Sequence, residues 1–186
     1  PVEGSAGVGV TAKAKATTGQ RPTKRGKRAA PPSTAAVVPG PTVVIDTREQ
    51  LPYELSPFVI GTLATGDYSL LGHEHRIAIE RKTKADAYNT IGQGRERFVR
   101  ELRRMAELEY AAIVVECSLV EFLVQPQYSK LRPRAAIRSL VSWSLRYGVH
   151  VHFAGDRAHA EALVMVILEK WWKYNVEGVA SHDDQA

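Results

Sequence analysis

Several features that restrict the fold or the location of a protein are rare or missing in these 186 residues. The only cysteine is Cys117, so the chain cannot form an internal disulfide bond, which is typical of a reducing compartment. No apolar run approaches the roughly 20 residues of a membrane-spanning helix, and the N-terminus has no signal-peptide hydrophobic segment. We therefore expect an intracellular protein, in the cytoplasm or nucleoid if its source is prokaryotic or a phage, and in the nucleus if it is eukaryotic.

Acidic and aromatic residues are scarce at the N-terminal end. Residues 1–41 contain seven Lys and Arg, one acid, Glu3, and no aromatic side chain. Such a segment cannot bury enough apolar surface to offset its ordering entropy, so we expect a disordered basic tail. A flexible basic arm attracts phosphates without regard to sequence, while a solubility tail or a localisation signal at residues 24–28 is an equal alternative. The formal charge of +5 comes from this tail, because the remaining residues are nearly balanced.

Strands alternate with helices in the rest of the chain, which indicates the α/β class. Residues 42–176 suffice for one domain, followed by a short C-terminal tail at 177–186. Pro52 and Pro57 predict irregular chain after the first strand. Short apolar runs predict buried strands at 43–45, 111–115 and 149–153. The spacing of apolar residues predicts helices at 83–91, 95–109, 119–124, 133–147 and 157–174.

A β-hairpin is predicted in the middle of the chain. Residues 68–71 and 76–79 pair about a tight turn at residues 73 and 74, so the numbers of two facing residues add up to 147. In that register Asp67 faces Glu80 at the end of the hairpin.

Carboxylates and an amine meet at this end of the hairpin. Lys82 shares the face of Glu80 because side chains alternate along a strand, and Asp46 adds a third carboxylate if its strand is the neighbour. Carboxylates this close repel one another unless a cation lies between them, and all-oxygen ligands suit Mg²⁺ or Mn²⁺ rather than zinc. The pattern predicts metal-assisted phosphodiester hydrolysis, in which Lys82 stabilises developing negative charge. An exposed hairpin end with ordinary charges is the alternative, and the rarity of the whole pattern argues against it.

The same residues resemble the XPF-type structure-specific endonucleases, whose signature is GD, ERK, three residues and D. Gly66-Asp67, Glu80-Arg81-Lys82 and Asp86 match this signature, and residues 45–49 are similar to the family's upstream I-D-x-R-E element. The resemblance covers about residues 43–175. It implies a restriction-endonuclease-like core, the PD-(D/E)XK fold, in which a mixed central sheet is flanked by helices.

The resemblance also implies roles for the residues of the site. The metal ligands would be Asp46, Asp67 and Glu80. Support of the site or contact with the DNA backbone is implied for Arg48 and Glu49. The complete catalytic set would be Asp46, Asp67, Glu80, Arg81, Lys82 and Asp86. Family members cut branched DNA such as flaps, forks and nicked junctions.

The predicted helix at 95–109 carries further candidates for DNA binding. Arg97, Arg100 and Arg104 share one of its faces and are placed to hold phosphates. Glu and Arg four residues apart are, however, typical of an ordinary solvated helix surface, and this interpretation is favoured. The pairs in question are 96–100, 97–101 and 103–107.

The chain departs from the family pattern after its last predicted helix. Family members usually carry a tandem helix-hairpin-helix module there, whereas about a dozen residues follow Tyr174. Substrate grip is therefore expected from the nuclease surface, the basic tail, a second subunit or another protein. Trp143, Trp171 and Trp172 on the later helices are candidates for a homodimer or heterodimer interface and, equally, for the core.

The leading hypothesis is a Mg²⁺- or Mn²⁺-dependent endonuclease that hydrolyses branched DNA in repair or recombination. One alternative is a catalytically silent DNA-binding scaffold of the same fold. The intact Glu80-Arg81-Lys82 argues against it, because a silent copy has no need for carboxylates that repel each other. The other alternative is a PD-(D/E)XK nuclease that acts on plain duplex DNA.

Overall fold

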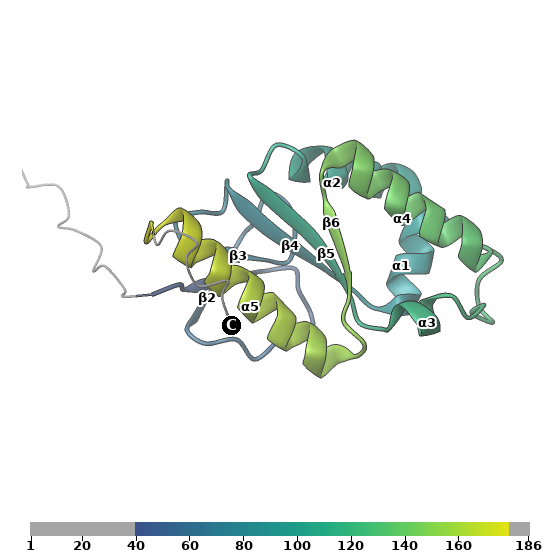
Figure 1. The fold of residues 1–186 in the computed structure, drawn as a ribbon, viewed down its shortest axis with the longest axis horizontal. Coiled ribbons are helices and arrows are strands. Elements are labelled where there is room, and N and C mark those ends of the chain that lie inside the picture. Colours follow the sequence, from purple (N-terminus) through teal and green to yellow (C-terminus); the bar gives the residue numbers. More distant parts are fainter. Residues whose placement is uncertain (1–39, 179–186) are drawn as a thin grey trace, which may run out of the picture. The chain divides into compact units, whose positions relative to one another are not determined.

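A computed structural model describes residues 40–178, so most of the predicted basic tail and of the C-terminal tail lies outside the described residues. A six-stranded mixed sheet forms the centre of this part, in the order β2-β1-β3-β4-β5-β6 (Figure 1). The strands are β1 (Val43–Asp46), β2 (Phe58–Gly61), β3 (Tyr68–Leu70), β4 (Ile77–Lys82), β5 (Tyr110–Val115) and β6 (His150–Phe153). The helices are α1 (Lys84–Ile91), α2 (Arg95–Met105), α3 (Leu119–Phe122), α4 (Pro133–Tyr147) and α5 (Arg157–Asn175).

Helices cover both faces of the sheet, as Figure 1 shows. Side chains from α1, α2 and α4 pack with Ile113 and Val115 of β5 in one apolar cluster, whereas α5 packs with Val114, β1, β3 and β4 in another. Because neighbouring residues of β5 are buried on opposite faces, this strand reads as a continuous apolar run. The predicted α/β class and the mixed sheet flanked by helices are confirmed. No helix within residues 40–178 combines the length and apolar composition that crossing a bilayer requires.

The order and register of the strands bring the predicted site residues together. Tyr68 pairs with Ile79 between the antiparallel strands β3 and β4, which is the predicted register. Strand β1 is the other neighbour of β3, and the Asp46 N–H donates a hydrogen bond to the Asp67 carbonyl at 2.9 Å. The carboxyl end of β1 therefore lies beside the end of the hairpin that carries Asp67 and Glu80.

The structure differs from the sequence prediction at one edge of the sheet and at some element ends. Residues 58–61, predicted to be irregular, form β2, which pairs in parallel with β1. This edge strand leaves three of its four residues exposed and so lacks the buried run expected of a strand. The hairpin connection spans residues 71–76 rather than a two-residue turn. The helices predicted to reach 109 and 124 end at Met105 and Phe122.

Candidate active site

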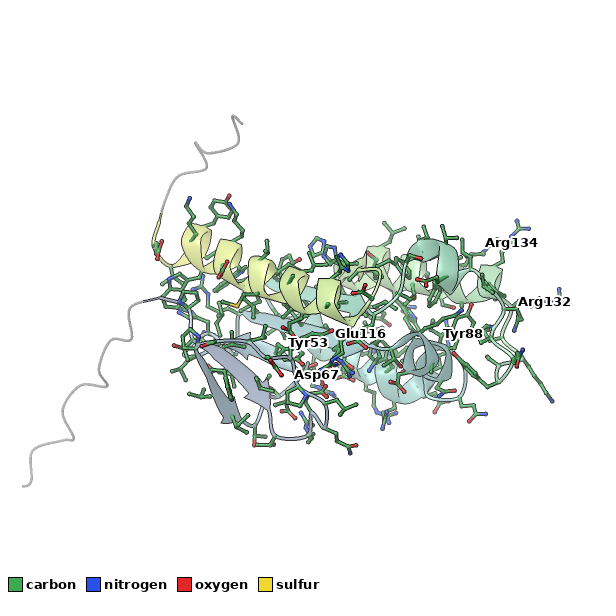
Figure 2. The ribbon with its side chains drawn as sticks, turned by 90° about the horizontal axis from the view of Figure 1, so that it is seen from below. Tyr53, Asp67, Tyr88, Glu116, Arg132 and Arg134 are labelled. Carbon is green, nitrogen blue, oxygen red and sulfur yellow. The ribbon has the colours of Figure 1, made fainter. Side chains whose placement is uncertain are left out.

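A pocket lies at the carboxyl ends of β1 and β4, on the face of the sheet covered by α2. It contains five basic and four acidic side chains together with one glycine. Most of the residues predicted for the site are among them, and Figure 2 shows Asp67 near the centre of the domain. The lining residues are Asp46, Arg48, Gly66, Asp67, Glu80, Lys82, Arg97, Arg100, Glu101 and Arg104.

Asp67 lies close beside β4 because the residue before it is a glycine. Gly66 has a φ of +76°, and a Cβ there would lie 3.1 Å from the Ile79 carbonyl oxygen, so a larger residue would be strained and crowded. This close approach lets the Asp67 N–H donate to that oxygen at 2.8 Å. The Arg81 N–H in turn donates to Asp67 Oδ2 at 2.8 Å, which fixes the carboxylate beside the end of β4.

Glu80 and Lys82 form an ion pair inside the pocket, and Glu80 is only 4% exposed. Burial raises the pKa of Glu80 to about 8, and Asp67 and Glu101 act in the same direction against Lys82. Burial likewise raises the pKa of Asp67 to about 6. Burial alone would lower the pKa of Lys82, but the neighbouring Glu80 carboxylate outweighs it and raises that pKa. The Lys82 ammonium therefore does not offset the effect of burial on the pKa values of Asp67 and Glu80.

Asp46 lies in the same pocket, but both of its carboxylate oxygens accept hydrogen bonds. Oδ1 accepts from Arg48 Nε at 2.6 Å and from the Arg48 N–H at 2.8 Å. Oδ2 accepts from Arg48 Nη2 at 3.0 Å and from the Leu63 N–H at 2.7 Å. Asp46 is 2% exposed, and these donors outweigh its burial and hold its pKa below the usual value. Coordination of a metal by Asp46 would need Arg48 to move, and its role as a ligand stays a prediction.

The chemistry of the remaining acidic residues bears on the predicted metal. Within residues 40–178 no group of three or more His, Cys, Asp or Glu side chains is arranged to hold an ion. Asp67 and Glu80 nevertheless present a partly buried and a buried carboxylate to the same pocket. Mg²⁺ is commonly held by one or two protein carboxylates, and waters and substrate phosphates complete its coordination. The oxygen donors of Asp67 and Glu80 fit Mg²⁺ or Mn²⁺.

Arg81 and Glu49 lie on the opposite face of the sheet from the pocket. Arg81 Nε contacts Glu116 Oε1 at 2.9 Å, and its Nη1 lies 3.7 Å from Glu49. Tyr53 donates its hydroxyl to the same Glu116 oxygen at 2.9 Å, and Arg157 of α5 contacts it at 3.2 Å. Tyr53 and Glu116 lie close together in Figure 2. The network joins the loop after β1 to β4, β5 and α5, and it anchors the arginine between Glu80 and Lys82.

Asp86 also lies outside the pocket lining. It stands in the first turn of α1, where its N–H donates to the Thr83 hydroxyl and its carboxylate accepts from the same hydroxyl at 2.7 Å. These bonds cap the helix that follows Lys82. The predicted catalytic roles of Arg81 and Asp86, and the support by Glu49, stay predictions.

The pocket also contains a residue that the sequence did not single out. Glu101 lines it together with Arg97, Arg100 and Arg104, and it raises the pKa values of Asp67 and Glu80. The sequence paired Glu101 with Arg97 on a solvated surface, yet none of the pairs 96–100, 97–101 and 103–107 forms an ion pair in the described part of the chain. Glu101 lies four residues after Arg97 and three residues before Arg104, a spacing that places it on the same side of a helix as these arginines. This spacing was the sequence signal that could have identified it.

The three tryptophans contribute to packing. Trp143 is buried against Phe98, with ring centroids 5.6 Å apart. Trp171 is also buried, and His73 contacts the rings of both Trp171 and Trp172. These residues therefore support the core interpretation, and dimerisation stays a prediction.

Comparison with known proteins gives two kinds of similarity. The ERCC4 domain family matches residues 45–167. The structure of XPF from Aeropyrum pernix is 25% identical with a TM-score of 0.54, covering 75% of this chain and 68% of that chain. The structure of XPF from Aeropyrum pernix in complex with DNA is 26% identical with a TM-score of 0.54, covering 72% and 66% respectively. The chain thus spans about two thirds of their length. No curated protein matches it closely enough to count as a relative.

Proposed function

The chain belongs to the ERCC4 domain family of XPF-type nucleases, and on this premise we propose that it is a Mg²⁺- or Mn²⁺-dependent endonuclease that hydrolyses branched DNA in repair or recombination. The observation that carries the proposal is the pocket in which Asp67, Glu80 and Lys82 meet three arginines of α2. An acidic centre with basic residues around it suits a phosphodiester held beside a divalent cation. Such an enzyme acts where cellular DNA is, so an intracellular location is part of the proposal.

Each residue of the acidic centre has a distinct task in this proposal. Asp67 and Glu80 would hold the ion. Asp46 would be a third ligand only if the Arg48 guanidinium moved away from its carboxylate. When bound, the ion supplies Lewis acidity, which polarises the scissile phosphate and acidifies water. Lys82 is protonated at neutral pH because its pKa is raised, so its Nζ donates a hydrogen bond to the attacking water or to a phosphate oxygen and does not act as a general base.

The arginines of α2 position the substrate. Arg97, Arg100 and Arg104 line the pocket on the side opposite β4, where they can donate to the non-bridging oxygens of the scissile phosphate and its neighbours. Arg104 is itself oriented by the Ala64 carbonyl, which accepts from its Nε at 3.2 Å. Phosphate contacts of this kind carry no sequence information, and they therefore suit an enzyme that selects DNA by its shape.

A cleavage assay tests the proposed activity. Labelled duplex, flap, fork and four-way DNA are incubated with Mg²⁺, Mn²⁺ or EDTA, and the wild type is compared with Asp67→Asn and Lys82→Ala. Exposed Glu107, two residues after the end of α2, provides Glu107→Gln as the matched control. We expect metal-dependent cutting of branched DNA that both site variants lose while they still bind DNA. Binding without cutting by the wild type would indicate a silent scaffold, and equal cutting of plain duplex would exclude the preference for branches.

We further propose that the protein dimerises through α4. Val141 is 51% and Leu145 is 83% exposed, and they line an open apolar groove with Ile137. Exposed apolar residues one helical turn apart on one helix suit the centre of a subunit interface. Sedimentation velocity of the wild type and of Leu145→Asp tests this, and a wild type that stays monomeric at all concentrations would contradict it.

A further inference from the structure

A stretch of the chain without acidic residues forms a basic surface near the start of α4. Residues 122–155 contain no Asp or Glu, although the globular part is nearly neutral as a whole. Lys130, Arg132 and Arg134 are exposed, and none of them forms an ion pair within residues 40–178. Figure 2 shows Arg132 and Arg134 projecting from the end of the domain that lies away from Asp67. Positive charge that no ion pair neutralises favours a polyanionic partner.

A polar groove of about 460 Å³ lies next to this basic surface, between the end of α1 and residues 128–131. Its lining includes Asn89, Gln93, Tyr128 and Lys130. Tyr128 is 60% exposed, so its side chain is accessible to a ligand. The amides of Asn89 and Gln93 offer both donors and acceptors, as the edges of nucleobases require. The groove therefore combines a stacking surface, amides and a cation.

Helix α1 links the proposed active site to the groove. Helix α1 has eight residues, starts two residues after Lys82, and ends at the groove. At about 1.5 Å per residue its length is about 12 Å. Gln93 lines the groove, whereas Arg97, one turn further along, lines the active-site pocket. A stacked DNA strand advances about 3.4 Å per nucleotide, so between three and four nucleotides span the length of α1.

We propose that this groove binds an unpaired strand of branched DNA, with Tyr128 stacked on a base and the basic residues 130–134 on the phosphates. The proposal rests on the proposed endonuclease function and identifies the part of the substrate that the groove selects. An unpaired strand is favoured over duplex, because base pairing and stacking hide the base faces that an aromatic side chain would contact. Grooves that pair positive charge with exposed aromatic rings bind single strands in this way.

Binding of fluorescent dT oligonucleotides, followed by anisotropy in EDTA, tests the proposal without catalysis. Tyr128→Ala is expected to weaken single-strand binding by about 5-fold to 150-fold per stacked base, whereas Tyr128→Phe keeps the wild-type affinity. Blunt duplex affinity should change less than twofold. Replacing both Arg132 and Arg134 by Gln should reduce the slope of log K against log salt by about 1.4. The matched control, Lys170→Gln at an exposed position on α5, should leave binding unchanged.

Equal losses on single strands and duplex, or no loss in Tyr128→Ala, would overturn the proposal. A thermal unfolding curve like that of the wild type shows that the variant is folded. If the wild type cuts no DNA but Tyr128→Ala still loses single-strand affinity, the proposed activity fails while the binding groove stands.

Cleavage of flaps of increasing length tests the geometry separately. Tyr128→Ala should lower kcat/KM about 5-fold or more for flaps of five nucleotides and leave flaps of one or two nucleotides unaffected, because short flaps do not reach the groove. A loss that is the same at every length would overturn the placement of the strand.

Discussion

Replacement of Asp67 by Asn should make the metal-free protein more stable at high pH while it abolishes metal binding. Burial raises the pKa of this carboxyl from 3.8 to about 6. The folded protein therefore favours the protonated carboxyl. The contribution of this group to the free energy of unfolding is complete below about pH 4 and is lost as the pH rises through about 6. Two pKa units correspond to about 3 kcal/mol. An amide at this position stays neutral, and its oxygen still accepts from the Arg81 N–H.

Urea unfolding followed by tryptophan fluorescence in EDTA measures this difference, since Trp143 and Trp171 are buried. At pH 4 the two proteins should be equally stable, whereas at pH 8 Asp67→Asn should be more stable by about 3 kcal/mol. For a domain of this size, that corresponds to about 6–12 °C in the midpoint of thermal unfolding. Mn²⁺ at one hundred times its Kd should stabilise the wild type by about 2.7 kcal/mol and the variant much less.

Glu107→Gln, at an exposed position outside the pocket, controls for the loss of a negative charge. A stability difference between the wild type and Asp67→Asn that does not change with pH would refute the reasoning about burial. Equal stabilisation of both proteins by Mn²⁺ would refute the assignment of Asp67 as a ligand.

Three further variants separate the roles of the neighbouring acidic residues. Asp46→Asn should lower the free energy of unfolding by about 2–4 kcal/mol, because it leaves the Leu63 N–H and Arg48 without their anionic acceptor. The same variant should change the affinity for Mn²⁺, measured by calorimetry, by less than threefold. A tenfold loss of affinity at unchanged stability would mean that Asp46 binds the metal. Glu116→Gln should reduce kcat more than it raises KM, since Glu116 anchors Arg81, which lies between Glu80 and Lys82 in β4. Full activity of this variant would contradict the positioning role of Glu116. Glu101→Gln removes a negative charge that raises the pKa of Glu80, so the acidic limb of kcat/KM against pH should move to lower pH; an unchanged or higher limb would contradict it.

The part of the site that lies on β3 and β4 could be predicted because it depends on local rules. Strand alternation places Glu80 and Lys82 on one face and Arg81 on the other, and the hairpin register places Asp67 beside Glu80. The apolar run of β4 and the glycine before Asp67 were sufficient signals. Helix α4 was equally predictable, because Pro133 marks its first turn and Gly148 its end.

The features that were missed depend on contacts between distant segments. The orientation of Glu101 depends on which face of α2 packs on the sheet, and Phe98, Leu102 and Met105 set that rotation together with α1 and α4. The bonds of Asp46 depend on Leu63, 17 residues away. Strand β2 depends on β1 for its hydrogen bonds and has too few buried residues to be recognised from its own sequence.

Strand β4 directs Arg81 to one face of the sheet and Glu80 and Lys82 to the other, and this alternation restricts insertions and deletions within the strand. Deletion or insertion of a single residue within Ile77–Lys82 would exchange the faces, so that Arg81 would enter the pocket and its two neighbours would turn towards α5. The connection at residues 71–76 has no such restriction, because it lies at the far end of the hairpin. Length variation among chains built on this plan should therefore accumulate in the connection and be absent from the strand.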